Sequence, residues 1–159
     1  MTWTRLEIDL NTQQLLAFEA NGCTAFPCST AARGAGEREG SQQTPRGVHR
    51  VRARIGAGLE THAVLVGRRP TGEYWSPALA EQWPDRDWIL GRILWLCGEE
   101  PGLNRGGDRD SQRRFIYIHG TPPTEPIGIA ASHGCIRLYP DIMMTVFDRT
   151  PIGCPVWIR

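Results

Sequence analysis

The chain contains no lysine, and all 18 of its basic residues are arginine. A Walker-type phosphate loop and Schiff-base chemistry both require an amine, so the absence of lysine excludes them. The formal net charge of +1 argues against nucleic acid or an anionic membrane surface as a partner held by charge. No apolar run approaches the roughly 18 residues of a membrane span. The composition therefore points away from nucleotide, nucleic-acid and membrane functions.

The N-terminal segment also lacks the apolar core of a secretory signal. Arg5, Glu7 and Asp9 place charges where such a signal would carry about 7–15 apolar residues in succession. If Met1 is the native start, we expect a cytoplasmic protein.

The chain has five cysteines, so at least one is unpaired within the chain. In a reducing cytosol we expect all five to be free thiols. Cys23 and Cys28 have no histidine nearby at the spacing of zinc ligands, so we expect no metal site. No nucleotide or flavin motif is present, and we expect no cofactor. The cysteines expected to be small core residues are Cys23, Cys28, Cys97 and Cys154.

The hydrophobic pattern predicts one domain over residues 1–159 with a mainly β fold and one or two short helices. Alternating or short apolar runs predict strands at 6–10, 14–19, 23–30, 48–55, 88–96, 115–118 and 155–158. Pro140 can begin a helix whose apolar face carries Ile142, Met143, Val146 and Phe147. The polar segments 31–47 and 99–114 are expected to be long loops.

Three arginines alternate with apolar residues in the strand predicted at 48–55. Val51, Ala53 and Ile55 would share one face, and Arg50, Arg52 and Arg54 would share the other. We favour a solvated arginine face over an anion-binding site, because charged side chains usually remain at the surface.

The most informative feature is a cysteine motif. Residues 132–138 read Ser-His-Gly-Cys-Ile-Arg-Leu, and His119 follows a predicted strand 16 positions before Cys135. A free thiol is only a few per cent thiolate at neutral pH, and a neighbouring imidazole changes this by taking its proton. We assign Cys135 as the nucleophile and His119 as its general base.

The remaining motif residues suggest supporting roles. His133 can shape the site or stabilise an oxyanion, and Gly134 lets the backbone turn and turns peptide N–H groups toward that oxyanion. Arg137 can grip a carboxylate through two hydrogen bonds. Arg113 and Arg114 are further candidates that could equally be solvated. A lone cysteine or histidine is usually structural, but this combination favours catalysis.

These residues resemble the catalytic domain of L,D-transpeptidases of the YkuD type. That family's signature is an upstream histidine followed by [Ser/Thr]-x-Gly-Cys-hydrophobic-[Arg/Asn], which His119, Ser132, Gly134, Cys135 and Arg137 match. The segment 44–47 (Thr-Pro-Arg-Gly) resembles the family's Thr-Pro-x-Gly element, and residues 153–158 resemble its closing strand.

The resemblance implies a β-sandwich or barrel-like domain with the cysteine in a groove under a mobile lid. It implies the tetrapeptide stem of peptidoglycan, free or as a muropeptide, as the substrate, cut at the L,D bond before terminal D-Ala. The thiolate would form a thioester acyl-enzyme. Substrate contacts are expected from Arg137, Ser132 and Gly120, and carbapenem-type β-lactams are expected to be covalent inhibitors.

The acceptor of the acyl group separates the remaining hypotheses. In the cytosol water would be the abundant acceptor, so we favour an L,D-carboxypeptidase that trims tetrapeptides to tripeptides during murein recycling. The alternative is an L,D-transpeptidase that forms cross-links or exchanges D-amino acids, and a remote alternative is a non-catalytic stem-peptide binder. If His119 and Cys135 react as a pair, the rate should be bell-shaped or reach a plateau near neutral pH.

Overall fold

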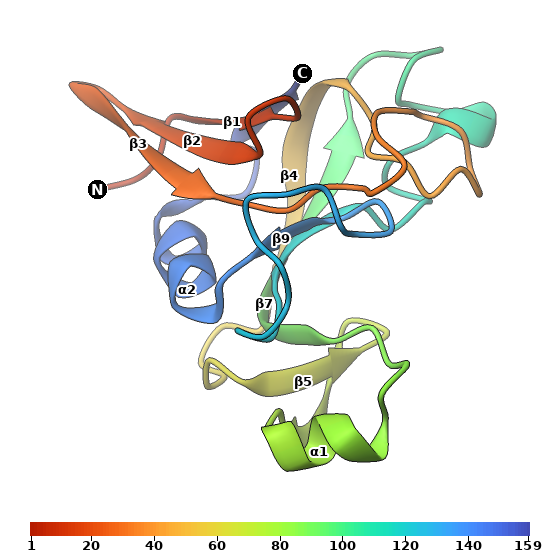
Figure 1. The fold of residues 1–159 in the computed structure, drawn as a ribbon. Helices are drawn as coiled ribbons and strands as arrows, with labels where there is room; N and C mark the ends of the chain where they lie inside the picture. The colour runs from red at the N-terminus through yellow and green to blue at the C-terminus, as the bar shows by residue number, and fades with distance from the viewer.

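The computed structural model describes residues 1–159, which form a ten-stranded sheet with two α-helices (Figure 1). The strands are β1 (Arg5–Asp9), β2 (Gln14–Glu19), β3 (Gly22–Pro27), β4 (Gly47–Ile55), β5 (Ala63–Val66), β6 (Arg69–Tyr74), β7 (Ile89–Gly98), β8 (Tyr117–Gly120), β9 (Ile136–Leu138) and β10 (Pro155–Ile158). The helices are α1 (Pro77–Gln82) and α2 (Pro140–Arg149), and Gly107–Arg109 form a single 3-10 turn. The mainly β fold with one or two short helices is confirmed.

Strand β7 organises the part of the sheet that carries the motif. One edge of β7 pairs with β4 and then β5, and its other edge pairs with β8. Strand β9 joins β8 in parallel, with Ile118 opposite Ile136 and His119 opposite Arg137. On the far side of β4 the order continues through β10, β1, β2 and β3. The short strand of the cysteine motif, β9, pairs with β8, and β8 pairs with the central strand β7. The sheet therefore holds the motif in place.

The main core lies between one face of the sheet and α2, which contacts β7 and β8 and lies below β1–β3 in the view of Figure 1. Pro140 occupies the first turn of α2, where its missing N–H has no intrahelical partner to lose. The buried face of the helix carries Met143, Val146 and Phe147, as the spacing predicts. Burying each such side chain contributes about 1.5–3 kcal/mol, so α2 fixes the strands on which the motif sits.

The β1–β2 hairpin and the closing strand β10 agree closely with the sequence pattern. Strand β3 ends earlier than expected, at Pro27, and β8 begins later, at Tyr117, so that His119 lies inside the strand rather than after it. The pattern does not predict β5, β6, α1 or β9. Strand β6 is polar and mostly exposed, and α1 has only six residues, none of them buried. Such short elements carry little hydrophobic periodicity.

The arginine face on β4 is only partly as expected. A β-bulge between Val51 and Ala53 shifts the register against β7, so the alternation does not continue unchanged. Arg54 consequently lies over the Phe147 ring at 4.2 Å and donates to the Phe147 carbonyl at 2.9 Å. Arg50 pairs with Glu99 at 2.6 Å, and Arg52 is exposed. The prediction of a solvated face was therefore wrong for Arg54.

All five cysteines are free. Cys28, Cys97 and Cys154 are buried, but Cys23 is exposed on β3, so its expected place in the core was wrong.

None of the helices has the length and apolar character needed to cross a membrane. A single domain over residues 1–159 stays a prediction.

Candidate active site

The motif residues lie on one face of the β8–β9 strand pair. Side chains alternate between the two faces of a strand, so His119 and Tyr117 share one face of β8, and Ile118 points to the other. Parallel register extends this arrangement to β9, where Arg137 lies opposite His119 and Cys135 stands level with Tyr117. His119 and Cys135 are therefore diagonal neighbours on this face.

The sulfur of Cys135 is held as a neutral thiol. Tyr117 donates its backbone N–H to Sγ at 3.3 Å, and the thiol can donate to the Phe115 carbonyl, also at 3.3 Å. A carbonyl acceptor favours the protonated form, because it requires the S–H. Burial raises the pKa of Cys135 to about 11, against the Tyr117 N–H, which lowers it. The thiol therefore needs a base at neutral pH.

His119 has the geometry of such a base. Its ring is buried, and Nδ1 lies 2.7 Å from the Gly120 carbonyl. A carbonyl can only accept, so Nδ1 carries the proton in this hydrogen bond and Nε2 keeps the lone pair. Burial lowers the pKa of His119 from 6.5, while the Gly120 carbonyl raises it. The imidazole is therefore neutral at pH 7 and able to accept a proton.

The turn before Cys135 is held by hydroxyl groups. Ser132 donates to the Cys135 carbonyl at 2.6 Å and accepts from the Gly134 N–H at 3.2 Å. Thr44, in the Thr-Pro-Arg-Gly element, donates to the Gly134 carbonyl at 3.0 Å. Gly134 has φ 134°, a conformation that other residues rarely adopt. The Gly134 N–H is thus engaged inside the turn, which leaves the Cys135 N–H as the better oxyanion donor.

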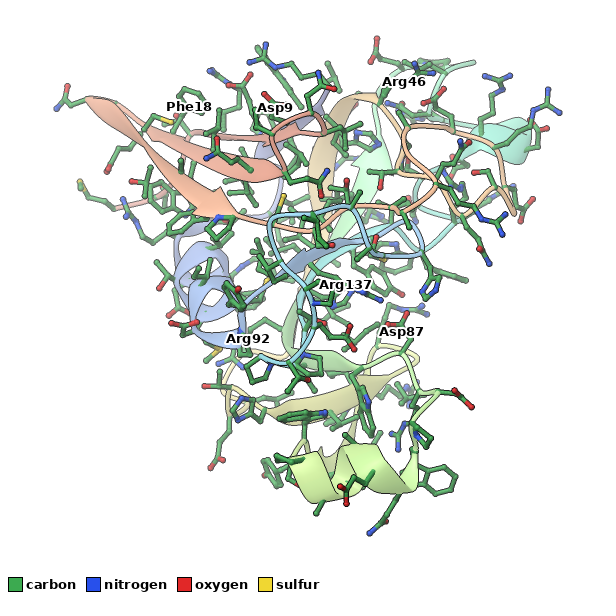
Figure 2. All side chains as sticks on the ribbon, in the orientation of Figure 1. Asp9, Phe18, Arg46, Asp87, Arg92 and Arg137 are labelled. Carbon is green, nitrogen blue, oxygen red and sulfur yellow. The ribbon has the colours of Figure 1, made fainter.

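Arg137 is buried and already paired. Its Nη2 lies 2.9 Å from Oδ1 of Asp87, and Glu125 lies 3.9 Å from Nη1. The second oxygen of Asp87 lies 3.6 Å from Nδ1 of His133, whose side chain is largely exposed. Figure 2 shows Asp87 and Arg137 beside each other. A grip on a substrate carboxylate, as predicted for Arg137, would require this guanidinium to exchange or share its partner.

Two hollows meet at His133. The larger, of about 300 Å³, is lined by Cys135, Gly134, Phe115 and Arg114 among others. The smaller, of about 180 Å³, is lined by Arg137, Asp87 and Glu125 among others. His133 lines both, so it separates the thiol from the ion-paired arginine.

Gly120 is a place of close packing. A Cβ atom there would lie within 2.4 Å of the Leu90 carbonyl on β7, so glycine lets β8 approach β7. Gly120 also supplies the carbonyl that orients His119. Direct contact of Gly120 or Ser132 with substrate stays a prediction.

Three residues outside the assigned set support the site: Thr44, Asp87 and Arg114. Arg114 is not solvated; its Nη2 donates to the Gln43 carbonyl at 2.7 Å and to the Ser41 hydroxyl at 3.3 Å, and its Nη1 donates to the carbonyls of Gly36 and Glu37. It thereby fastens the 31–47 loop beside Cys135. The Thr-Pro-Arg-Gly element signalled Thr44, and the sequence had already offered Arg114 as a further candidate, whereas nothing local distinguishes Asp87 from a surface charge.

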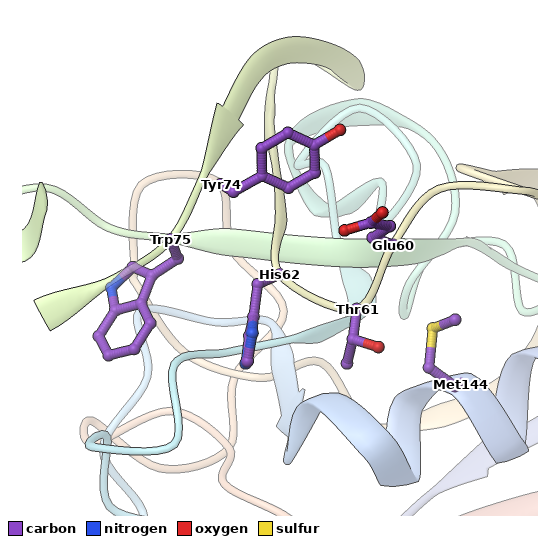
Figure 3. Close-up of a pocket in the computed structure, with 6 residues that line it drawn as sticks. All are labelled: Glu60, Thr61, His62, Tyr74, Trp75 and Met144. Atoms are coloured by element: carbon purple, nitrogen blue, oxygen red, sulfur yellow. The ribbon is translucent and has the colours of Figure 1, made fainter.

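Another hollow, of about 410 Å³, lies away from the cysteine (Figure 3). Its walls come from the segment before β5, the end of β6 and the helix α2, and its lining residues are Glu60, Thr61, His62, Tyr74, Trp75 and Met144. It contains no thiol and no residue of the motif. Size therefore does not identify the reactive site in this protein, because the nucleophile lines a smaller hollow.

The geometry describes a β-sheet domain in which a thiol and an oriented imidazole share one strand-pair face. The chain belongs to the L,D-transpeptidase catalytic domain family (YkuD), whose model matches residues 4–158. The resemblance carried by the motif is thereby confirmed.

Three relatives illustrate the extent of the likeness. The probable L,D-transpeptidase ErfK/SrfK of Salmonella typhimurium is 44% identical over 45 residues, which are 28% of this chain and 15% of that protein. The crystal structure of the L,D-transpeptidase from Xylanimonas cellulosilytica aligns with a TM-score of 0.56 at 22% identity, covering 99% of this chain and 61% of that one. L,D-transpeptidase 3 from Mycobacterium tuberculosis, in complex with a faropenem-derived adduct, aligns with a TM-score of 0.56 at 16% identity. The alignment covers 97% of this chain and 59% of that one. The chain spans less than two thirds of each relative, and the structural likenesses show a shared fold.

Proposed function

We propose that this domain transfers an acyl group from peptidoglycan tetrapeptide stems through a thioester on Cys135, breaking the L,D bond before terminal D-Ala. The observation that carries the proposal is the placement of Cys135 and His119 on one face of β8–β9, with Nδ1 of His119 bound to a carbonyl. Membership in the L,D-transpeptidase family supports the choice of substrate.

In the first half of the reaction, the thiol turns from its resting acceptor, the Phe115 carbonyl, toward His119. Nε2 of His119 takes the thiol proton as Sγ attacks the carbonyl carbon of the L-residue. The oxyanion develops near the backbone N–H of Cys135. The C–N bond then breaks, the imidazolium returns its proton to the leaving amine of D-Ala, and the acyl group remains on Sγ.

We propose water as the preferred acceptor in the second half, which makes the domain an L,D-carboxypeptidase acting on stems in murein recycling. Cys135 is half-buried and lines an open hollow, so water can reach the thioester. His119 then takes a proton from that water as the water oxygen bonds to the thioester carbon, the C–S bond breaks, the imidazolium returns the proton to Sγ, and the tripeptide acid leaves. A cytoplasmic location belongs to the same proposal.

A specific observation also favours the alternative, an L,D-transpeptidase. The hollow across His133 from the thiol is lined by the carboxylates of Asp85, Asp87 and Glu125, against the two guanidinium groups of Arg86 and Arg137. This excess of acid suits the ammonium group of an amine acceptor. An amine bound there could attack the thioester in place of water.

Incubation with a defined tetrapeptide stem, followed by mass analysis, tests the proposal. Release of D-Ala with a tripeptide product is expected from the wild type and not from Cys135→Ala. Adding D-Met or a second stem in excess then distinguishes the two acceptors, since exchange products outpacing the tripeptide would overturn the preference for water. Failure to release D-Ala, with the Cys135 thiol shown to be free, would overturn the proposed function.

A carbapenem or a penem provides an independent test of the nucleophile. We expect faropenem or imipenem to add its mass to the peptide 115–137, which holds Cys135 as its sole cysteine. Because the chain has no lysine, trypsin would release this peptide by cleaving after Arg114 and Arg137. No adduct on a reduced protein would contradict a nucleophilic Cys135 and favour a non-catalytic binder.

A further inference from the structure

Arg137 places a buried positive charge on the reactive face of the β8–β9 pair. Its side chain is 6% exposed, and it stands directly opposite His119 in the parallel register. The ring of His119 is buried too. An uncompensated guanidinium at this place would stabilise a thiolate at Cys135 and oppose a proton on His119.

Asp87 supplies the compensating charge. It lies between α1 and β7, 50 positions from Arg137 in the sequence, and its two oxygens reach Arg137 at 2.9 Å and His133 at 3.6 Å. One carboxylate therefore joins the two motif residues that flank Cys135 in the sequence.

Other charged groups face the same site. Glu125 lies 3.9 Å from Arg137, and Asp85 and Arg86 line the smaller hollow without an ion pair to Arg137. On the thiol side are Glu39, Arg113 and Arg114, which line the larger hollow, and Tyr117, whose N–H reaches the sulfur. Among these groups, Asp87 makes the shortest ion pair with Arg137.

We propose that Asp87 is a positioning residue that holds the reactive pair in its neutral thiol–imidazole form by neutralising Arg137. The inference rests on the proposed cysteine chemistry and adds that Asp87 influences the protonation of His119 and Cys135. Burial is the main influence on both groups of the pair, but the Asp87 charge raises the pKa of His119 and of Cys135, and the Arg137 charge lowers both. Loss of the carboxylate should therefore release protons from both groups at lower pH.

The test follows alkylation of Cys135 by iodoacetamide from pH 6 to 10, which requires no stem peptide. The tryptic peptide 115–137 reports on Cys135 alone, even though Cys23 is also exposed. For Asp87→Asn we expect alkylation at pH 8 to be about three- to tenfold faster, because removing a nearby unit charge in a partly screened site shifts a pKa by roughly half to one unit. The acid limb of the turnover profile should move down by a similar amount.

Asp85→Asn is the matched control, since it removes the same formal charge from the same hollow without touching the ion pair. Asp85→Asn should leave the alkylation profile of Cys135 unchanged, and Asp87→Glu should restore the profiles that Asp87→Asn shifts. Unchanged profiles in a folded Asp87→Asn protein, or equal shifts in Asp85→Asn, would overturn the inference. If Asp87→Asn does not fold, Glu125→Gln should give a smaller shift in the same direction, and no shift there would overturn the inference.

The two proposals fail separately. If the stems are not cleaved but the alkylation profile shifts as expected, the proposed function is wrong and the role of Asp87 stands. If the stems are cleaved and neither profile shifts, the role of Asp87 is wrong and the proposed function stands.

Discussion

The two faces of the β8–β9 strand pair differ in almost every physical respect. One face carries Ile118, Ile136 and Leu138, which are fully buried against the main core. The other carries His119, Cys135 and Arg137, which are polar or ionisable and border the two hollows. Because successive side chains of a strand point to opposite faces, consecutive residues of the motif lie alternately on the core face and on the reactive face. The difference teaches that Ile136 and Leu138 hold the reactive residues in place.

The largest expected effect is on the reactive face. Cys135→Ala should reduce turnover of a tetrapeptide stem at least about 10³-fold, because the acyl group loses its attachment point. The free energy of unfolding should change little, since the side chain is half-buried and outside the main core. Cys23→Ala, at an exposed thiol, should change neither quantity. Turnover retained in Cys135→Ala would contradict the assigned nucleophile.

On the core face, Ile136→Ala should lower the free energy of unfolding by about 2–5 kcal/mol, since Ile136 is fully buried and its loss leaves a cavity. Urea denaturation measures this change. Ile152→Ala makes the same substitution at a residue that is 64% exposed, and its effect should stay within about 0.5 kcal/mol. Similar losses in the two variants would remove the distinction between the faces.

The comparison also shows what the sequence could predict. The alternation around Cys135 and the hairpin 6–19 are local patterns, so the nucleophile, the histidines and the first two strands could be recognised from their neighbours. Thr44 and Asp87 act through contacts with residues 90 and 50 positions away. No local periodicity encodes such contacts, and only the short Thr-Pro-Arg-Gly element drew attention to Thr44.

The same limit explains the errors on β4 and β5–β6. The bulge that turns Arg54 toward Phe147 depends on register with β7, which the alternation of β4 alone does not reveal. Strands β5 and β6 are short, and β6 is mostly exposed, so their pairing with each other and with β7 defines them more than their composition does. Asp87 follows this unpredicted segment, which is why its role was missed.

The pH dependence of kcat/KM tests whether His119 and Cys135 react as a pair. Burial lowers the pKa of His119 below 6.5, and burial raises that of Cys135 to about 11. Protonated His119 cannot accept the thiol proton, so kcat/KM should fall about tenfold per unit below the His119 pKa. It should be flat across neutral pH, because the neutral pair persists there. A rate that rises only through pH 8–9 would instead indicate a thiol that reacts without His119.

The smallest effect is expected at Tyr74, on the hollow that lacks a nucleophile (Figure 3). Tyr74 is 57% exposed and contributes to no core cluster, so Tyr74→Ala should leave kcat/KM within about twofold and stability within about 0.5 kcal/mol. Steady-state kinetics with the tetrapeptide stem and urea denaturation measure the two quantities.

Phe115→Ala is the matched comparison for Tyr74→Ala. Phe115 is similarly exposed, at 51%, but it lines the hollow of Cys135, and its backbone carbonyl accepts from the thiol. Truncating its ring keeps that carbonyl while removing apolar surface beside the sulfur, so KM for the stem should rise several-fold with kcat less affected. A larger loss of kcat/KM in Tyr74→Ala than in Phe115→Ala would mean that the stem lies in the hollow of Figure 3. The motif on β8–β9 would then supply the nucleophile without the main binding surface.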